Sequence, residues 1–170
     1  MSRLLHWRSL ANLTLQLAIL ALLMAAAFFV RTWQVSGPSM TPHISSGEYV
    51  LINTFAYRLS QPKRGDIVVF RNDEDTRAVF IKRVVGLPGD RIHVDRGSVF
   101  IDGRRLAETY VRHPDDRSFP ETTVPPHAVY VLGDNRADSE DSRFFGPVPD
   151  DRLMGQALAG IWPPADLGTL

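Results

Sequence analysis

The stretch of sequence that decides the fold is Val79-Phe80-Ile81-Lys82-Arg83-Val84-Val85, an apolar run interrupted by two basic residues. Such a run predicts a β-strand, whose successive side chains point to opposite faces of a sheet. Phe80, Lys82 and Val84 then share one face, while Arg83 points the other way. An ammonium among apolar neighbours loses hydration, and this loss favours the neutral amine. The strand therefore offers Lys82 as a candidate proton acceptor.

Short β-branched runs alternate with turn residues on either side of this strand. From Val35 onward no stretch keeps a helical apolar period for three turns, which favours a mostly β domain with antiparallel strands. Asp102-Gly103 is typical of a two-residue hairpin turn. The segment 107–127, rich in Pro, Asp and His, is expected to be a short exposed excursion. We expect strands at Tyr49–Asn53, Ile67–Arg71, Ala78–Val85, Arg91–Val94, Ser98–Ile101, Ala128–Leu132 and Met154–Trp162.

Composition excludes several classes of function. The chain has 170 residues, enough for one domain with an appendage, and its formal net charge is zero. It has no basic run that would suggest nucleic-acid binding. Cysteine is absent, which excludes thiol catalysis, disulfides and cysteinyl metal sites. The five histidines show no HExxH-type spacing, so the sequence predicts neither a metal centre nor a cofactor.

The N-terminal part of the chain predicts a membrane anchor. Residues 10–30 carry no charge, and as a helix they span about 31 Å, close to the roughly 30 Å of a hydrocarbon core. Trp7 and Trp33 bracket the segment, as interfacial tryptophans do. Arg3 and Arg8 against Arg31 favour a cytosolic position for residues 1–9 and an extracytoplasmic domain at 35–170.

A cleavable signal peptide is the main alternative for this segment. Ala25-Ala26-Ala27 offers a small-residue cleavage site, but the apolar run continues beyond it through Val30.

Ser39 lies between two prolines, Pro38 and Pro42, which restrict its backbone. A single serine in such a loop is ordinarily a turn residue. A nucleophile elbow would need glycine at position 41, where the chain has threonine. His43 is a conceivable base, but we expect no carboxylate nearby to orient it, so the sequence favours an ordinary loop residue.

Lys82 also has a non-catalytic interpretation, as a lysine on an edge strand whose ammonium group is exposed to solvent. A catalytic role would need its pKa to fall from about 10.4 to about 8, which requires roughly 3.3 kcal/mol of bias toward the neutral amine. The polar stretch 133–143 would, by itself, be a solvated loop.

Taken in order, five motifs resemble those of type I signal peptidases, the bacterial leader peptidase family with a Ser/Lys dyad. The resemblance runs from about Val35 to Trp162, and the preceding membrane helix also fits the pattern. The motifs are Ser39-Met40-x-Pro42, Arg64-Gly65-Asp66-Ile67-Val68, the stretch from Lys82-Arg83-Val84-Val85 to Gly89-Asp90, Gly133-Asp134-Asn135-Arg136, and Ser139-x-Asp141-Ser142-Arg143.

The resemblance implies a β-barrel-like domain with defined roles for these residues. Ser39 would be the nucleophile and Lys82 the general base, a pair that needs no histidine. Ser139 would hydrogen-bond and orient the lysine. Asp141 and Arg143 would form a charged pair that holds the loop, with Asp134 in the same supporting role. The N–H of Ser39 would form part of the oxyanion hole.

The resemblance also implies how substrate binds. An extended precursor segment would pair with the strands near Val35–Gly37 and Val79–Lys82. Shallow pockets lined by Met40, Phe80 and Ile81 would admit alanine at the first and third positions before the cut, as a steric filter.

Two positions depart from the family pattern. Some members have a serine two residues before the nucleophile as a second oxyanion donor, where this chain has Gly37. A backbone group or Ser36 would have to replace that donor, which stays unassigned. His43 and Ile44 stand where threonine and leucine are usual.

The sequence therefore predicts a membrane-anchored serine endopeptidase that removes signal peptides from exported precursors. Its partners would be precursors with Ala-x-Ala sites and the lipid bilayer. The form of Gly133-Asp134-Asn135-Arg136 favours a bacterial cytoplasmic membrane. The alternatives are a dedicated Ser/Lys maturation protease of a conjugation or secretion system, a self-cleaving regulator, and a non-catalytic membrane-tethered domain that binds peptides.

Overall fold

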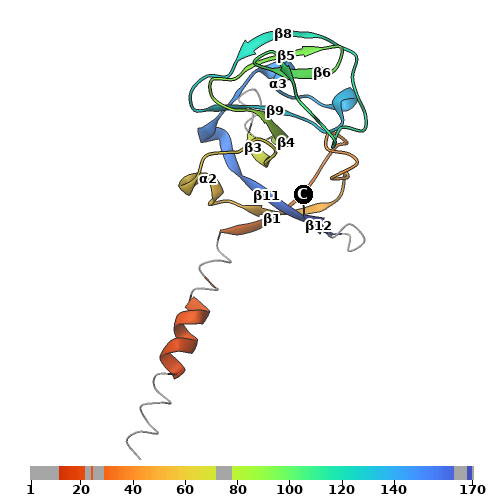
Figure 1. Ribbon diagram of the computed structural model, residues 1–170. Coiled ribbons are helices and arrows are strands. Elements are labelled where there is room, and N and C mark those ends of the chain that lie inside the picture. The colour runs from red at the N-terminus through yellow and green to blue at the C-terminus, as the bar shows by residue number, and fades with distance from the viewer. Residues whose placement is uncertain (1–11, 22–23, 25–28, 72–77, 163–167, 170) are drawn as a thin grey trace, which may run out of the picture.

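The computed structural model describes residues 12–21, 24, 29–71, 78–162 and 168–169 (Figure 1). Residues 12–21 and 24 are helical and exposed. None of the helices within these described ranges has the length and apolar content needed to cross a membrane. Much of the predicted anchor, including residues 25–28, lies outside the described residues. Val30, expected to end the anchor helix, instead begins strand β1 because it pairs with Asn53 of a neighbouring strand.

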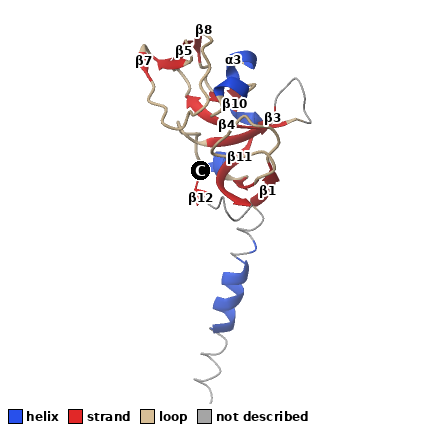
Figure 2. Ribbon diagram, turned by 90° about the vertical axis from the view of Figure 1, so that its right-hand side faces the viewer, coloured by secondary structure: helices blue, strands red, loops and turns tan. Residues whose placement is uncertain are grey.

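Eight strands, counted over the described residues, form the larger sheet (Figures 1 and 2). Its order is β1-β2-β11-β3-β4-β9-β10, with β12 paired to β11, and all of its strand pairs are antiparallel. The sheet curls, and register shifts in the β11–β2 and β11–β3 pairs add the local bends that bulges produce. The strands are β1 (Val30–Gln34), β2 (Tyr49–Asn53), β3 (Ile67–Arg71), β4 (Val79–Gly86), β9 (Ala128–Leu132), β10 (Val148–Pro149), β11 (Leu153–Trp162) and β12 (Gly168–Thr169).

A smaller sheet lies beyond β9, with the order β7-β6-β5-β8 among the described strands. Its hairpin turns at Asp102-Gly103 as predicted, since both residues have positive φ angles of 50° and 76°. The sheet consists of β5 (Arg91–Asp95), β6 (Ser98–Ile101), β7 (Arg104–Arg105) and β8 (Phe119–Thr123). Strand β8 belongs to the segment 107–127, which the sequence had suggested to be an excursion. It carries Pro120 and few apolar residues, and it pairs only with β5, as an edge strand does.

Short helical turns connect the strands. They are α2 (Ala56–Leu59), the 3-10 turn η1 (Arg136–Asp138), α3 (Ser142–Phe145) and the 3-10 turn η2 (Asp150–Arg152). Asn135 and Asp141 cap η1 and α3 with their side chains, which accept hydrogen bonds from the backbone of Asp138 and Arg143.

The core explains why the predicted strands form. Strand β3 is buried on both faces: Ile67 and Val69 pack in one apolar cluster, and Val68 and Phe70 pack in another. Strand β9 is likewise buried along its whole length. Continuous apolar runs of this kind are expected for strands covered on both sides. The seven predicted strands occur with bounds within one residue of those expected, and the mostly β prediction is confirmed.

Candidate active site

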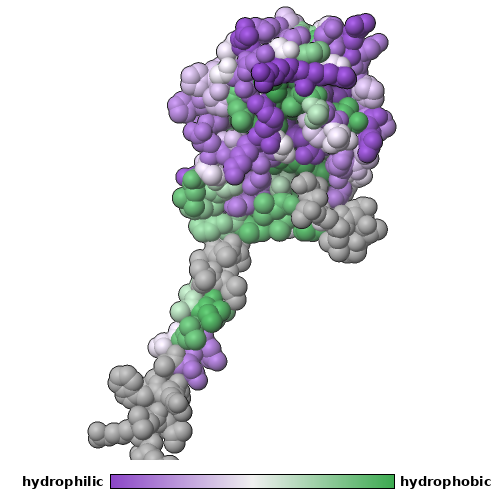
Figure 3. Space-filling view, viewed as in Figure 1, coloured by the Kyte–Doolittle hydropathy of each residue, from purple (hydrophilic) through white to green (hydrophobic). Residues whose placement is uncertain are grey.

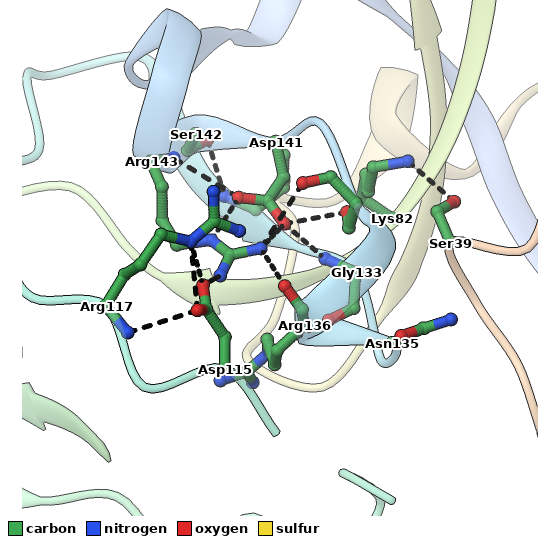
Figure 4. A network of polar contacts seen from close by, with 12 residues as sticks. Ser39, Lys82, Asp115, Arg117, Gly133, Asn135, Arg136, Asp141, Ser142 and Arg143 are labelled. Atoms are coloured by element: carbon green, nitrogen blue, oxygen red, sulfur yellow. Dashed lines mark hydrogen bonds and ion pairs between the residues drawn. The ribbon is translucent and has the colours of Figure 1, made fainter. Parts of the chain in front are cut away.

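The side chains of Ser39 and Lys82 meet at a cleft in the curled sheet (Figure 4). Lys82 comes from β4, and Ser39 lies in the loop that follows β1. Lys82 Nζ lies 2.8 Å from Ser39 Oγ and 3.1 Å from the backbone carbonyl oxygen of Ile81. The fold therefore brings the predicted nucleophile and the predicted base within hydrogen-bonding distance, although they are far apart in the sequence.

The surroundings of Lys82 favour its neutral form. The residue is only 3 % exposed, and its Nζ lies 5.5 Å from the centre of the Phe80 ring, on the face predicted from the strand alternation. Burial lowers the pKa of Lys82 from 10.5 to about 8, against the opposing charges of Asp141 and Glu140. A substantial fraction of the amine is therefore unprotonated at mildly alkaline pH.

Asn135 holds the loop that carries Ser39. Its backbone N–H donates to the carbonyl of Ser39 over 3.0 Å. Its side-chain Nδ2 donates to the carbonyl of Pro38 and to Thr41 Oγ1, at 3.2 and 3.1 Å. Asn135 belongs to the motif Gly133-Asp134-Asn135-Arg136, but the sequence predicts no role for it. Only its three long-range contacts identify it as a clamp on the loop.

Gly133 allows this close approach of two loops. A Cβ atom at this position would lie 2.6 Å from the Ser39 carbonyl oxygen and in direct collision with Ser139 Oγ. Its N–H donates to Asp141 Oδ2 over 3.0 Å. The glycine is therefore required by space and not by its backbone angles.

The N–H of Ser39 has no acceptor among the described residues, so it is available to an incoming group. The N–H of Gly37 donates instead to Ser46 Oγ over 3.2 Å. Ser36 lines the cleft.

Ser139 differs from what the resemblance implies. Its hydroxyl donates to Asp141 Oδ2 over 2.7 Å, and the hydrogen bonds of Lys82 within the described chain go to Ser39 and Ile81. Asp141 is fully buried, so its carboxylate needs several donors, and the hydroxyl two residues away is one of them. Ser139 thus contacts the carboxylate that stabilises the charged form of Lys82.

Asp141 and Arg143 form the expected ion pair, and further ion pairs join it (Figure 4). Arg143 Nε lies 2.8 Å from Asp141 Oδ1, and Arg143 Nη1 lies 2.7 Å from Asp115 Oδ2. Burial alone would raise the pKa of Asp115, but hydrogen bonds and the charges of Arg117 and Arg143 lower it. Arg136 also forms a buried bidentate pair with Glu108.

These pairs attach the segment 107–127 to the loop 133–143. The sequence motifs do not identify Glu108 and Asp115 as partners of Arg136 and Arg143, because the members of each pair are 28 residues apart. In the sequence, these ion pairs are indicated only by the alternation of acidic and basic residues in both segments.

Asp134 connects the loop to β4. It is fully buried and accepts two hydrogen bonds from Arg83, at 2.9 and 2.7 Å. Burial alone would lower the pKa of Arg83, but the hydrogen bonds and charge of Asp134 raise it. The guanidinium also lies over the Tyr110 ring at 4.5 Å.

The expectation that His43 lacks a nearby carboxylate is wrong. His43 Nδ1 lies 3.3 Å from Asp134 Oδ2, because the fold brings together residues that are far apart in the chain. That carboxylate is already engaged by Arg83, and in the described structure the hydroxyl of Ser39 contacts Lys82.

The cleft beside the pair has a volume of about 470 Å³. Phe80 and Ile81 line it as expected. Met40 does not line it: its side chain is fully buried in the core cluster with Val35. Strand β9 pairs with β4 only from Arg83 onward, so the backbone edge of residues 79–82 on that side has no strand partner in the described chain.

Comparisons with known proteins agree with this geometry. A sequence model of the family described as "Signal peptidase, peptidase S26" matches residues 7–162. A probable signal peptidase I-2 from Synechocystis is 34% identical over 169 residues, which cover 96% of this chain and 77% of the relative. Signal peptidase I from Leptolyngbya laminosa is 35% identical over 164 residues, 92% of this chain and 81% of the relative.

A solved structure is also similar. The crystal structure of a signal peptidase I from Enterococcus faecalis matches with a TM-score of 0.50 at 30% identity. The match covers 57% of this chain and 97% of that one. The chain therefore belongs to the signal peptidase S26 family, the serine endopeptidases that cleave signal peptides from precursor proteins.

Proposed function

We propose that this chain cleaves signal peptides with Ser39 as nucleophile and Lys82 as general base. The observation that carries the proposal is the 2.8 Å contact between Lys82 Nζ and Ser39 Oγ. A neutral amine at this distance can accept the hydroxyl proton, and the lowered pKa of Lys82 supplies that neutral amine near pH 8.

The proposed reaction has two stages. Ser39 Oγ attacks the scissile carbonyl while its proton passes to Lys82 Nζ, and the N–H of Ser39 donates to the oxyanion that forms. The resulting ammonium returns the proton to the leaving amine, which departs as the new N-terminus. A water molecule then gives a proton to Lys82 and attacks the acyl-enzyme. As the ester bond breaks, Lys82 returns this proton to Ser39 Oγ, so the signal peptide is released and both residues regain their starting forms.

The charged network supports this pair indirectly. Asp141 and Arg143 hold the loop 133–143 internally, and Asp134 joins it to Arg83 of β4. Ser139 would act through Asp141, whose charge stabilises the protonated form of Lys82. These four residues are proposed as supporting groups that do not touch the substrate.

The unpartnered edge at residues 79–82 supports an extended substrate. A peptide strand that pairs there would present its scissile bond to Ser39, with Val35–Gly37 on the opposite wall of the cleft. Phe80 and Ile81 would limit the size of its side chains, so we propose selection of alanine before the cut.

We also propose membrane attachment through the uncharged segment that ends before Val30, with the catalytic domain on the extracytoplasmic side of a bacterial cytoplasmic membrane. The absence of charge over residues 10–30 supports this. Exposed apolar side chains near β1, including Val30 and Trp33, also support it.

The test is processing of a precursor with an Ala-x-Ala site by the full-length wild type, Ser39→Ala and Lys82→Ala, with N-terminal sequencing of the product. We expect cleavage after the second alanine by the wild type and loss of processing in both variants, with unchanged circular dichroism. Activity retained in Lys82→Ala but lost in His43→Ala would indicate a histidine base and refute the proposal.

No specific observation favours a dedicated maturation protease, since the relatives compared above are called signal peptidase I. Cleavage of several unrelated precursors would distinguish a general enzyme from a dedicated one. Single-turnover product would exclude a domain that only binds peptides.

A further inference from the structure

A second cleft of about 570 Å³ lies beside the catalytic one. It is formed by β1, β2, α2, β3 and the beginning of β11. Trp33 and Val69 line both clefts, so the two are neighbours along the curled sheet. None of the catalytic or supporting residues lines the second cleft. The proposed catalytic function therefore does not explain which residues line the second cleft.

Three arginines line this cleft: Arg31 from β1, Arg58 from α2 and Arg71 from β3. All three are exposed, and none forms an ion pair with a carboxylate of the described residues. This contrasts with Arg83, which is held by Asp134. Arg58 also lies over the Phe55 ring at 5.8 Å. Exposed guanidinium groups along one cleft offer a site for phosphate, which they can bind in a bidentate manner.

The carboxylates of Asp150 and Asp151 also line the cleft, but each lies near a basic side chain other than the three arginines. Asp151 lies 3.9 Å from Arg152, and Asp150 lies 3.9 Å from His127. Asp150 Oδ1 is buried and has no hydrogen-bond partner.

The cleft lies at the base of the domain, where the chain enters from the N-terminal helix. The labels of α2, β1 and β11 mark this region in Figure 1. Apolar surface gathers at the same base in Figure 3. The exposed large apolar side chains of these elements are Val30, Trp33, Tyr49, Leu59 and Leu158. A surface that combines apolar side chains with arginines is suited to the boundary between lipid tails and headgroups.

We propose that the cleft of Arg31, Arg58 and Arg71 binds the phosphate headgroup of an anionic phospholipid such as phosphatidylglycerol. The proposal rests on the membrane attachment proposed above. A lipid bound there would fix the domain against the bilayer through its base. Since Trp33 lines both clefts, this would set the height of the catalytic cleft above the membrane surface.

The experiment compares retained lipid in the full-length protein. Protein reconstituted in equal mixtures of phosphatidylglycerol and phosphatidylcholine is released into the gas phase, and bound lipids are counted by native mass spectrometry. The variant is Arg31→Gln/Arg58→Gln/Arg71→Gln. The matched control is Arg104→Gln/Arg105→Gln/Arg112→Gln, which removes the same charge from exposed positions beyond the cleft.

We expect wild type and control to retain phosphatidylglycerol in preference to phosphatidylcholine. The cleft variant should lose affinity for phosphatidylglycerol by about fivefold for each arginine removed. Cleavage of a soluble peptide in detergent should be unchanged in all three proteins. That second measurement separates the two proposals, since it tests the catalytic function without lipid.

Three results would overturn the proposal. Equal retention of the two lipids by wild type would exclude a headgroup site, as would an equal loss in the control variant. Displacement of the bound lipid by millimolar inorganic phosphate, with no preference between the lipids, would assign the cleft to free phosphate. A raised KM for soluble peptide in the cleft variant, measured in detergent, would assign it to the precursor chain.

Discussion

Burial of a single amine is the central physical feature at the scale of residues. Lys82 is nearly inaccessible, and within the described part of the chain its ammonium has a hydroxyl and a carbonyl as its hydrogen-bond partners. Desolvation therefore disfavours the charged form more than Asp141 and Glu140 can compensate.

The pH dependence of cleavage follows from this pKa. If neutral Lys82 is the base, kcat/KM should rise with pH, with a midpoint near the pKa of about 8 and a plateau above it. The measurement is hydrolysis of a soluble peptide by the full-length enzyme between pH 6 and 10. A lower midpoint that disappears in His43→Ala would contradict the lysine assignment.

The same group should destabilise the fold at neutral pH. Lowering its pKa from 10.5 to about 8 corresponds to a cost of about 3 kcal/mol below pH 8. Between these two pKa values the unfolded chain binds more protons, so this cost disappears as pH rises from about 8 to 10.5. Lys82→Met keeps the length of the side chain and removes the charge. We expect it to raise the free energy of unfolding by about 1–3 kcal/mol at pH 6 and by less at pH 10.

Urea unfolding at both pH values measures this difference. Lys63→Met is the matched control, since Lys63 is exposed and should change stability little. An equal effect of Lys82→Met at pH 6 and pH 10 would show that the amine carries no buried-charge cost.

At the scale of elements, two loops carry the site, and each holds the other in position. Asn135 clamps the loop after β1, and Gly133 lets the two loops approach closely. The sequence predicted the strands well because their apolar runs are local signals. It could not predict the contacts of Asn135, which depend on how the two loops meet.

Asn135→Ala tests this clamp. Loss of its two side-chain hydrogen bonds to the Ser39 loop should lower kcat by about tenfold with little change in KM, because Ser39, the proposed nucleophile, is displaced while the cleft remains. Stability should fall by about 1–2 kcal/mol. Steady-state kinetics and urea unfolding measure the two effects.

Asn53→Ala provides the control, since Asn53 caps the N–H of Phe55 outside both clefts. It should cost similar stability and leave kcat unchanged. Equal kinetic effects of both variants would mean that Asn135 acts only on overall stability.

At the scale of the whole molecule, the ordered motifs predicted the family and the short β-branched runs predicted the mostly β class, and both predictions are confirmed. Three features could not be predicted from the sequence and are seen only in the folded structure. Met40 follows Ser39, the proposed nucleophile, but its side chain packs in the core. His43 lies close to the carboxylate of Asp134, which is distant in the sequence. Strand β8 forms from a segment with little apolar pattern, since pairing with β5 and the ion pairs of Asp115 and Glu108 hold it. Long-range charge pairing leaves no local periodicity, so sequence reasoning could not find it.

The edge of β4 at residues 79–82, which no described strand pairs with on the β9 side, has a consequence for turnover. A precursor segment that pairs along residues 79–82 belongs to the part removed, so the released signal peptide would keep those backbone contacts after the bond is cut. Departure of this fragment would then slow each catalytic cycle, and its accumulation would cause product inhibition. Efficient secretion would depend on another activity that degrades the fragment or withdraws it into the bilayer.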